Sequence, residues 1–183
     1  HMIDLSTTYA GLKLKSPLIV SSSGLTSSVE RIRKMEQAGA GAVVLKSLFE
    51  EQILHEVGTM AAGNSYPEAA DYLKTYAREN SLGSYLELIR AAKEATGFPV
   101  IASINCTSSA EWVGFAKKIG EAGADALELN IYFLPIKKDK HPSEYENAYL
   151  ELVSSVKKHT SLPVMVKLGS QFSNITWMAE QLF

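Results

Sequence analysis

The sequence lacks most of the features that mark specialised classes of protein. Its 183 residues include a single cysteine, Cys106, so an internal disulfide is impossible and a structural zinc site is not expected. No apolar run approaches the roughly 18 residues of a membrane span, and no secretory leader is visible. The formal net charge of -2 comes from scattered acidic and basic residues. We therefore expect a cytoplasmic protein without nucleic-acid or membrane partners.

The composition is that of an ordinary folded domain. Hydrophobic residues make up 46% of the chain and charged residues 21%, enough apolar material for a substantial core. We interpret residues 1–183 as one domain, in which His1 and Met2 are the remnant of an expression tag. No metal site is expected.

Five apolar segments have the length and pattern of buried strands, and each is followed by a helical pattern. The strand segments lie within residues 16–24, 41–47, 98–106, 126–135 and 162–169. Alternation of unbroken apolar strands with helices predicts a parallel sheet covered by helices. We predict an α/β fold of the TIM (β/α)8-barrel type, with about five of the eight units present. A doubly wound dinucleotide fold is the weaker alternative, since no Gly-x-Gly-x-x-Gly follows the first strand.

The connection after the second strand is unusually long. Residues 48–83 lack a clear period, and helical spacing resumes only from Ser84. A connection of this length in a compact domain is typical of a functional excursion, so we predict a hairpin or lid over a site. Ser27 is expected to cap the first helix.

Polar residues gather where the predicted strands end. Glu128 and Asn130 lie two residues apart, on one face of an extended chain. Lys46 and Lys167 each end a buried strand, and burying an ammonium without an anion is costly. In a barrel of parallel strands these ends meet at the mouth, where ligands bind. The predicted binding residues are Ser22, Ser23, Gly24, Lys46, Ser47, Asn105, Asn130 and Lys167.

The ordered set of strand motifs resembles the dihydroorotate dehydrogenase family. The motifs are Ser-Ser-Ser-Gly at 21–24, Gly-Ala-Val-Val-Leu-Lys-Ser at 41–47, Ile-Ala-Ser-Ile-Asn at 101–105, Ala-Leu-Glu-Leu-Asn-Ile at 126–131 and Pro-Val-Met-Val-Lys at 163–167. The resemblance implies a (β/α)8 barrel with FMN at its mouth and hydride transfer from a small-molecule substrate to the flavin.

The resemblance also assigns roles to the predicted binding residues. Ser22, Ser23 and Gly24 would approach the flavin. Lys46, Ser47 and Lys167 would lie at the flavin, where the two lysines stabilise negative charge on the reduced ring. Asn105 would contact the flavin, and Asn130 would bind the flavin or the substrate.

One part of the family pattern is missing. The family places a serine or cysteine base shortly after the asparagine of the fourth strand, whereas this chain reads Asn-Ile-Tyr-Phe-Leu-Pro at 130–135. Tyr132 is the only ionisable group nearby, and its ordinary pKa is about 10. The catalytic base is therefore unassigned, and the substrate is described only as dihydropyrimidine-like. Cys106 is open to two interpretations, a nucleophile or a buried structural thiol.

The number of strands leads to expectations about cofactor and assembly. A (β/α)8 barrel typically needs about 250 residues, and its phosphate site commonly follows strands seven and eight. Five units correspond to the amino-terminal part of such a barrel, so we expect the phosphate-binding part to be missing and FMN affinity to be weak or absent. An open sheet edge also predicts a homo-oligomer.

Two other functions are open. Lys167 or Lys46 could be the nucleophile of a Schiff-base lyase or aldolase on the same barrel. Alternatively, the chain could be a non-catalytic barrel fragment that self-associates.

Overall fold

The central element is a curled parallel sheet with helices on its outer face. The computed structural model describes residues 3–49, 67–105 and 112–183. Five strands lie side by side in chain order, and β5 (Leu48–Phe49) also pairs with β6. The five are β3 (Ile19–Val20), β4 (Ala42–Val44), β6 (Val100–Asn105), β7 (Ala126–Asn130) and β8 (Val164–Lys167). This half-barrel confirms the predicted β/α-barrel class.

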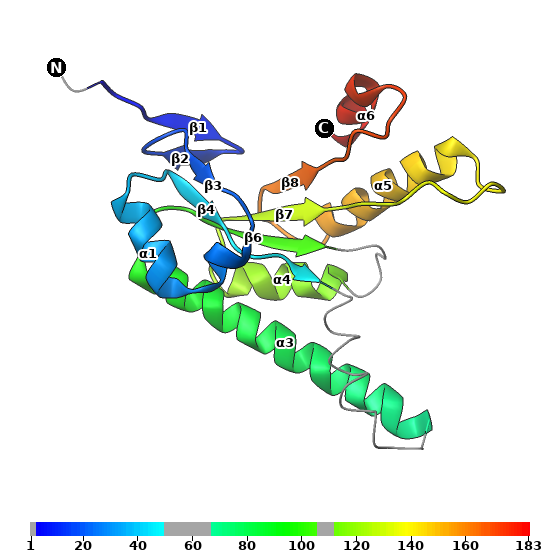
Figure 1. Cartoon of the computed structure of the whole chain (residues 1–183), viewed down its shortest axis with the longest axis horizontal. Helices are drawn as coiled ribbons and strands as arrows, with labels where there is room; N and C mark the ends of the chain where they lie inside the picture. The colour runs from blue at the N-terminus through cyan, green and yellow to red at the C-terminus, as the bar shows by residue number, and fades with distance from the viewer. Residues whose placement is uncertain (1–2, 50–66, 106–111) are drawn as a thin grey trace.

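The helices follow the strands in alternation. Figure 1 shows the long helix α3 and helices α1, α4 and α5 against the sheet, with α6 beyond β8. Their bounds are η1 (Gly24–Ser27), α1 (Val29–Gln37), α3 (Pro67–Ala95), α4 (Trp112–Glu121), α5 (Pro142–Lys157) and α6 (Ile175–Leu182). None of the helices in the described ranges is long and apolar enough to cross a membrane.

The alternation of side chains along the strands creates two cores. Residues such as Leu127 and Leu129 face the helices and join the larger core. Residues such as Val44, Ile101 and Ala126 face the concave side and form a smaller interior core. Alternate residues along each strand therefore supply the two faces of the sheet, as in a complete barrel.

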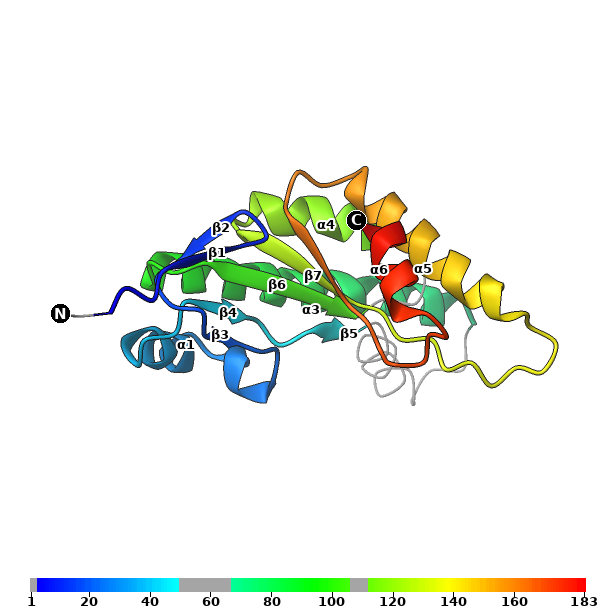
Figure 2. The same ribbon diagram turned by 90° about the horizontal axis from the view of Figure 1, so that it is seen from above.

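An amino-terminal hairpin closes one end of the concave side, and we did not predict it. Strands β1 (Thr7–Tyr9) and β2 (Leu12–Leu14) pair antiparallel around Ala10 and Gly11, whose φ angles are 49° and 76°. Two successive positive φ angles are typical of a tight hairpin turn. Leu14 is buried in the interior core. Figure 2 shows the hairpin at the end of the sheet opposite the segment that follows β7.

Two local predictions need correction. Helix α3 begins at Pro67, well before Ser84, because a proline is well suited to the first helical position and glycine is tolerated within a helix. Of the predicted excursion at 48–83, residues 50–66 lie outside the described residues, and the lid stays a prediction.

Ser27 does not cap α1, because its hydroxyl donates to the Gly24 carbonyl at 2.8 Å and Ser28 occupies the cap position.

Candidate functional site

The concave face of the sheet changes from apolar to polar along the strands. The register pairs Ile101 with Ala126 in a first row, and Ser103 with Glu128 in a second. A third row joins Asn105 to Asn130 and Asn130 to Lys167. Register partners in a parallel sheet present their side chains to the same face. The predicted residues Asn105, Asn130 and Lys167 therefore lie together at the carboxyl ends of three strands.

Hydrogen bonds connect the ends of the strands into one polar network. We use this name for Ser22, Ser47, Ser103, Glu128 and Lys167. Ser22 Oγ lies 3.1 Å from Ser47 Oγ, which lies 2.7 Å from Ser103 Oγ. Ser103 donates to Glu128 Oε1 at 2.8 Å, and Lys167 Nζ lies 3.6 Å from the same oxygen. The network therefore crosses from the segment after β3 to the end of β8.

The charge of Glu128 fixes the direction of every hydroxyl in the polar network. A carboxylate only accepts, so the Ser103 proton points to Glu128. Ser103 must then accept from Ser47, and Ser47 must accept from Ser22. The Ser47 amide also donates to Ser22 Oγ at 2.9 Å. Ser22 thus has its proton committed and keeps one lone pair for a donor at the mouth.

A tyrosine from α3 supports the centre of the polar network. Strand β4 pairs with β6 up to Val44, and the pairing resumes in β5 at Leu48. Between these points the Tyr85 phenol accepts from the Ser103 amide at 2.8 Å and donates to the Ser103 carbonyl at 3.1 Å. Burial raises the pKa of the Tyr85 phenol well above its usual range. Tyr85 is therefore a neutral side chain that holds Ser103 in place.

The other predicted site residues lie nearby but in different settings. Lys46 follows β4 and is exposed at the same edge of the sheet. Ser23 caps η1 by accepting from the Leu25 amide at 3.2 Å, and Gly24 is the first residue of that helix. Tyr132 is half exposed in the segment after β7. Cys106 lies outside the described residues.

A cavity of about 310 Å³ opens on the concave side below the polar ends. Its wall includes Glu128, Met165 and Lys167 from β7 and β8, together with Tyr9 from the hairpin. The glutamate side chain is 15% exposed and the lysine side chain 49% exposed. The lysine therefore reaches solvent, while its carboxylate partner is largely enclosed.

Two members of the polar network were not among the predicted site residues. Ser103 is fully buried, and its apolar neighbours in the strand do not mark it as a site residue. A signal was nevertheless present, because Ser103 precedes Asn105 by two residues and so shares its face. Glu128 stands in the same relation to Asn130, and the sequence singles out the two residues as a pair.

A curled parallel sheet with outer helices and polar carboxyl ends defines a protein of the β/α-barrel class. A family model described as dihydroorotate dehydrogenase matches residues 4–181. The chain belongs to the dihydroorotate dehydrogenase family, as its motifs predicted.

Curated relatives agree with this family. The chain is 30% identical to the catalytic subunit of dihydroorotate dehydrogenase B (NAD(+)) of Thermoplasma acidophilum over 191 aligned residues. That alignment covers 98% of this chain and 59% of the relative. Its counterpart from Pyrococcus abyssi is 32% identical, with 93% of this chain and 56% of the relative covered. The chain thus spans a little over half the length of these relatives.

Solved structures share the fold at low sequence identity. A protein of the dihydrodipicolinate synthase family from Coccidioides immitis aligns with a TM-score of 0.54 and 16% identity, covering 92% of this chain and 50% of that one. Dihydrodipicolinate synthase of Bacillus anthracis aligns with a TM-score of 0.50 and 16% identity, covering 90% and 46%. These likenesses support the fold alone.

Proposed function

We propose that this chain forms the flavin-ring side of an FMN-dependent oxidoreductase that takes hydride from a dihydropyrimidine-like substrate. The observation that carries the proposal is the polar network, which joins Ser22, Ser47 and Lys167 at one edge of the sheet. Membership of the dihydroorotate dehydrogenase family supports the same reaction class. The relatives' name, catalytic subunit of dihydroorotate dehydrogenase B, supports a small-molecule substrate.

The residues at the mouth fit the ring of a flavin. A flavin ring offers both hydrogen-bond acceptors and a donor along one edge, and it becomes more negative on reduction. Lys167 supplies a cation that is half exposed, and Ser22 supplies a lone pair. Asn105 and Asn130 lie in the same row as Lys167 and carry amides that both donate and accept. This set of donors and acceptors suits the flavin ring.

Each of these residues would contribute by position and charge. When bound, FMN would supply the hydride acceptor. Lys167 would stabilise negative charge that develops beside it, and Glu128 keeps the ammonium oriented through their 3.6 Å contact. Ser22 would accept a hydrogen bond from the ligand because its own proton points to Ser47. The identity of the proton acceptor stays open, with Tyr132 as the candidate in the segment after β7.

The direct test is a titration of flavin fluorescence with the purified chain. FMN and riboflavin are compared, because they differ only in the phosphate. We expect both to bind with similar, weak affinity, since the contacts on this chain are to the ring. Lys167→Ala and Lys46→Ala should each weaken binding by about tenfold, the effect of losing one charge-assisted contact.

Lys138→Ala is the matched control, because Lys138 is exposed on the segment between β7 and α5. It removes the same charge from a residue that does not line the concave-side cavity. If the fluorescence of neither flavin changes at any protein concentration, this chain does not bind the flavin ring. Equal losses in Lys138→Ala and Lys167→Ala would show that binding is nonspecific.

Among the residues that the structure describes, no contact favours the Schiff-base alternative over the flavin proposal, and the alternative stays a prediction. Borohydride trapping of a carbonyl compound on Lys167 or Lys46 is its test.

A further inference from the structure

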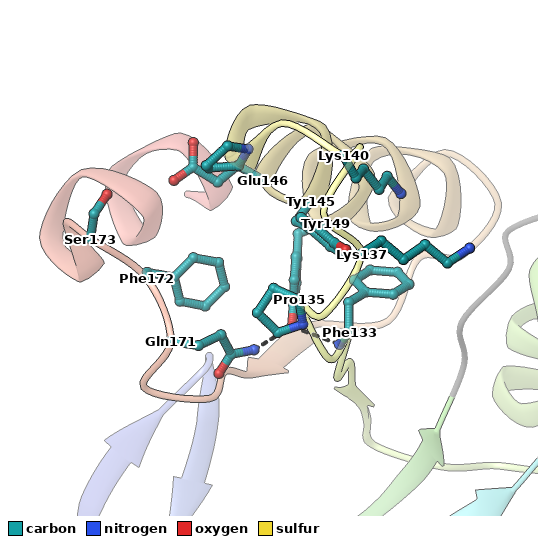
Figure 3. A pocket seen from close by; sticks show the side chains of 11 residues that line it. Phe133, Pro135, Lys137, Lys140, Tyr145, Glu146, Tyr149, Gln171, Phe172 and Ser173 are labelled. Carbon is teal, nitrogen blue, oxygen red and sulfur yellow. Dashed lines mark hydrogen bonds between the residues drawn. The ribbon is translucent and has the colours of Figure 1, made fainter.

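A second cavity lies outside the concave face, between the segments that follow β7 and β8. Its volume is about 330 Å³, within the range of small-molecule sites. Figure 3 shows its lining side chains, which come from the segment after β7, from α5 and from the segment after β8. The proposed flavin site makes no use of this cavity.

Aromatic rings form much of the wall. The Phe133 and Tyr149 rings meet edge to face with centroids 5.0 Å apart, and Tyr149 and Phe172 meet similarly at 5.1 Å. Such walls favour a flat apolar ring as occupant. Tyr145 also lines the cavity, and its phenol oxygen is buried without a hydrogen-bond partner among the described residues. The wall therefore contains a polar atom whose hydrogen bond is not supplied by the described residues.

The charged residues around the cavity favour an anion. Lys137 and Lys140 lie at one side of it in Figure 3, and Glu146 lies across from them. The Lys140 ammonium sits 4.7 Å from the centre of the Tyr145 ring, so its charge is held against the aromatic wall. Two cations against one carboxylate give the lining a net positive charge.

Tyr149, which lines the cavity, is hydrogen-bonded to the segments that follow β7 and β8. The Tyr149 phenol accepts from the Phe133 amide at 3.2 Å and from Gln171 Nε2 at 3.1 Å, and it donates to the Ile131 carbonyl at 3.3 Å. Tyr149 therefore ties together the two segments that continue from Asn130 and Lys167. A molecule in this cavity would contact both segments.

We propose that this cavity binds a small aromatic carboxylate, with the ring against Phe133, Tyr149 and Phe172 and the carboxylate toward Lys137 and Lys140. This site would be separate from the flavin site and needs no flavin. The cavity lies between the segments that continue from Asn130 and Lys167. A molecule bound there is therefore suited to act as an effector of the proposed flavin site, a role that rests on the proposed function.

The test is a titration followed by amide NMR on the whole chain, with benzoate as the probe. Benzyl alcohol, which has the same ring without the charge, is run beside it. We expect benzoate to shift the Phe133 backbone amide and the Gln171 side-chain amide, and to bind at least about tenfold more tightly than benzyl alcohol.

Variants then locate the anion. The double variant Lys137→Ala/Lys140→Ala should lose most of the benzoate affinity, whereas Lys117→Ala/Lys138→Ala, with the same loss of charge outside the cavity, should keep it. Glu146→Gln should strengthen benzoate binding, because it removes the opposing charge.

Three outcomes would overturn the proposal. Benzoate could leave the Phe133 and Gln171 signals unmoved. Benzyl alcohol could bind as well as benzoate, which would mean a merely apolar cavity. Finally, benzoate binding could depend on Lys46 and not on Lys137 and Lys140, which would place the anion at the mouth of the half-barrel.

Discussion

The polar network predicts that Ser103→Ala is costly although it removes a single oxygen. Ser103 is fully buried and donates to Glu128 Oε1 at 2.8 Å. The substitution also takes away the acceptor of the Ser47 hydroxyl, which lies 2.7 Å away. A hydrogen bond to a charged group contributes about 1.5–3 kcal/mol, and an unsatisfied buried hydroxyl costs about 1–3 kcal/mol. We expect a loss of about 3 kcal/mol in the free energy of unfolding.

The assay is urea unfolding followed by circular dichroism, with the midpoint and slope fitted for each variant. Glu128→Gln keeps an oxygen that can accept from Ser103 but removes its charge, and should cost about 1–2 kcal/mol because the ion pair with Lys167 is partly exposed. Since Ser103→Ala removes the hydrogen bond that Glu128→Gln weakens, the double variant should cost about 1 kcal/mol less than the sum.

Ser154→Ala is the control, because Ser154 is exposed on α5 and should change stability by less than about 0.5 kcal/mol. A Ser103→Ala variant as stable as this control would refute the connected network. Strict additivity of Ser103→Ala and Glu128→Gln would refute the contact between them.

Three further predictions concern stability and assembly. Gly41→Ala should cost about 2–3 kcal/mol in urea unfolding, because a Cβ there collides with the Ser16 carbonyl oxygen; Gly83→Ala, with nothing within 4 Å, is the tolerated control. Because burial raises the pKa of Tyr85, folding keeps this phenol neutral; stability is full below the unfolded pKa of about 10 and falls as pH rises above it. Tyr85→Phe should flatten that alkaline decline, and an unchanged profile would contradict the assignment. Strands β3 and β8 are the edges of the described sheet, so sedimentation should show species larger than a monomer, and a clean monomer would contradict self-association.

The order of strands and helices could be predicted because the relevant signals are local. Apolar runs of strand length and helical spacing each depend on neighbouring residues. Gly39 and Gly123 follow the ends of α1 and α4, and both have φ of 97°, which favours glycine. Asn174 has the residue type that favours a helix start, and it caps α6 by accepting from the Trp177 amide at 3.0 Å.

The polar network could be predicted only in part because its contacts join distant segments. Ser22 and Ser47 were selected as strand ends, but their hydrogen bond depends on how β3 and β4 align. Ser103 lies in the middle of an apolar run, and its spacing of two residues from Asn105 is a weak signal by itself. Tyr85 reaches it from a helix whose start was misplaced, and no spacing rule connects the two.

The register of the sheet has a consequence for how this mouth can change over generations. Glu128 and Asn130 share the concave face because a single residue, Leu129, separates them, and Leu129 faces the helices. Loss or gain of a single residue within β7 would exchange the two faces of the strand. The Glu128 carboxylate would then be buried among the helices, and Leu129 would face the concave side. New ligands can therefore be acquired by replacing alternate residues in place, whereas changes of length are confined to the connections between strands.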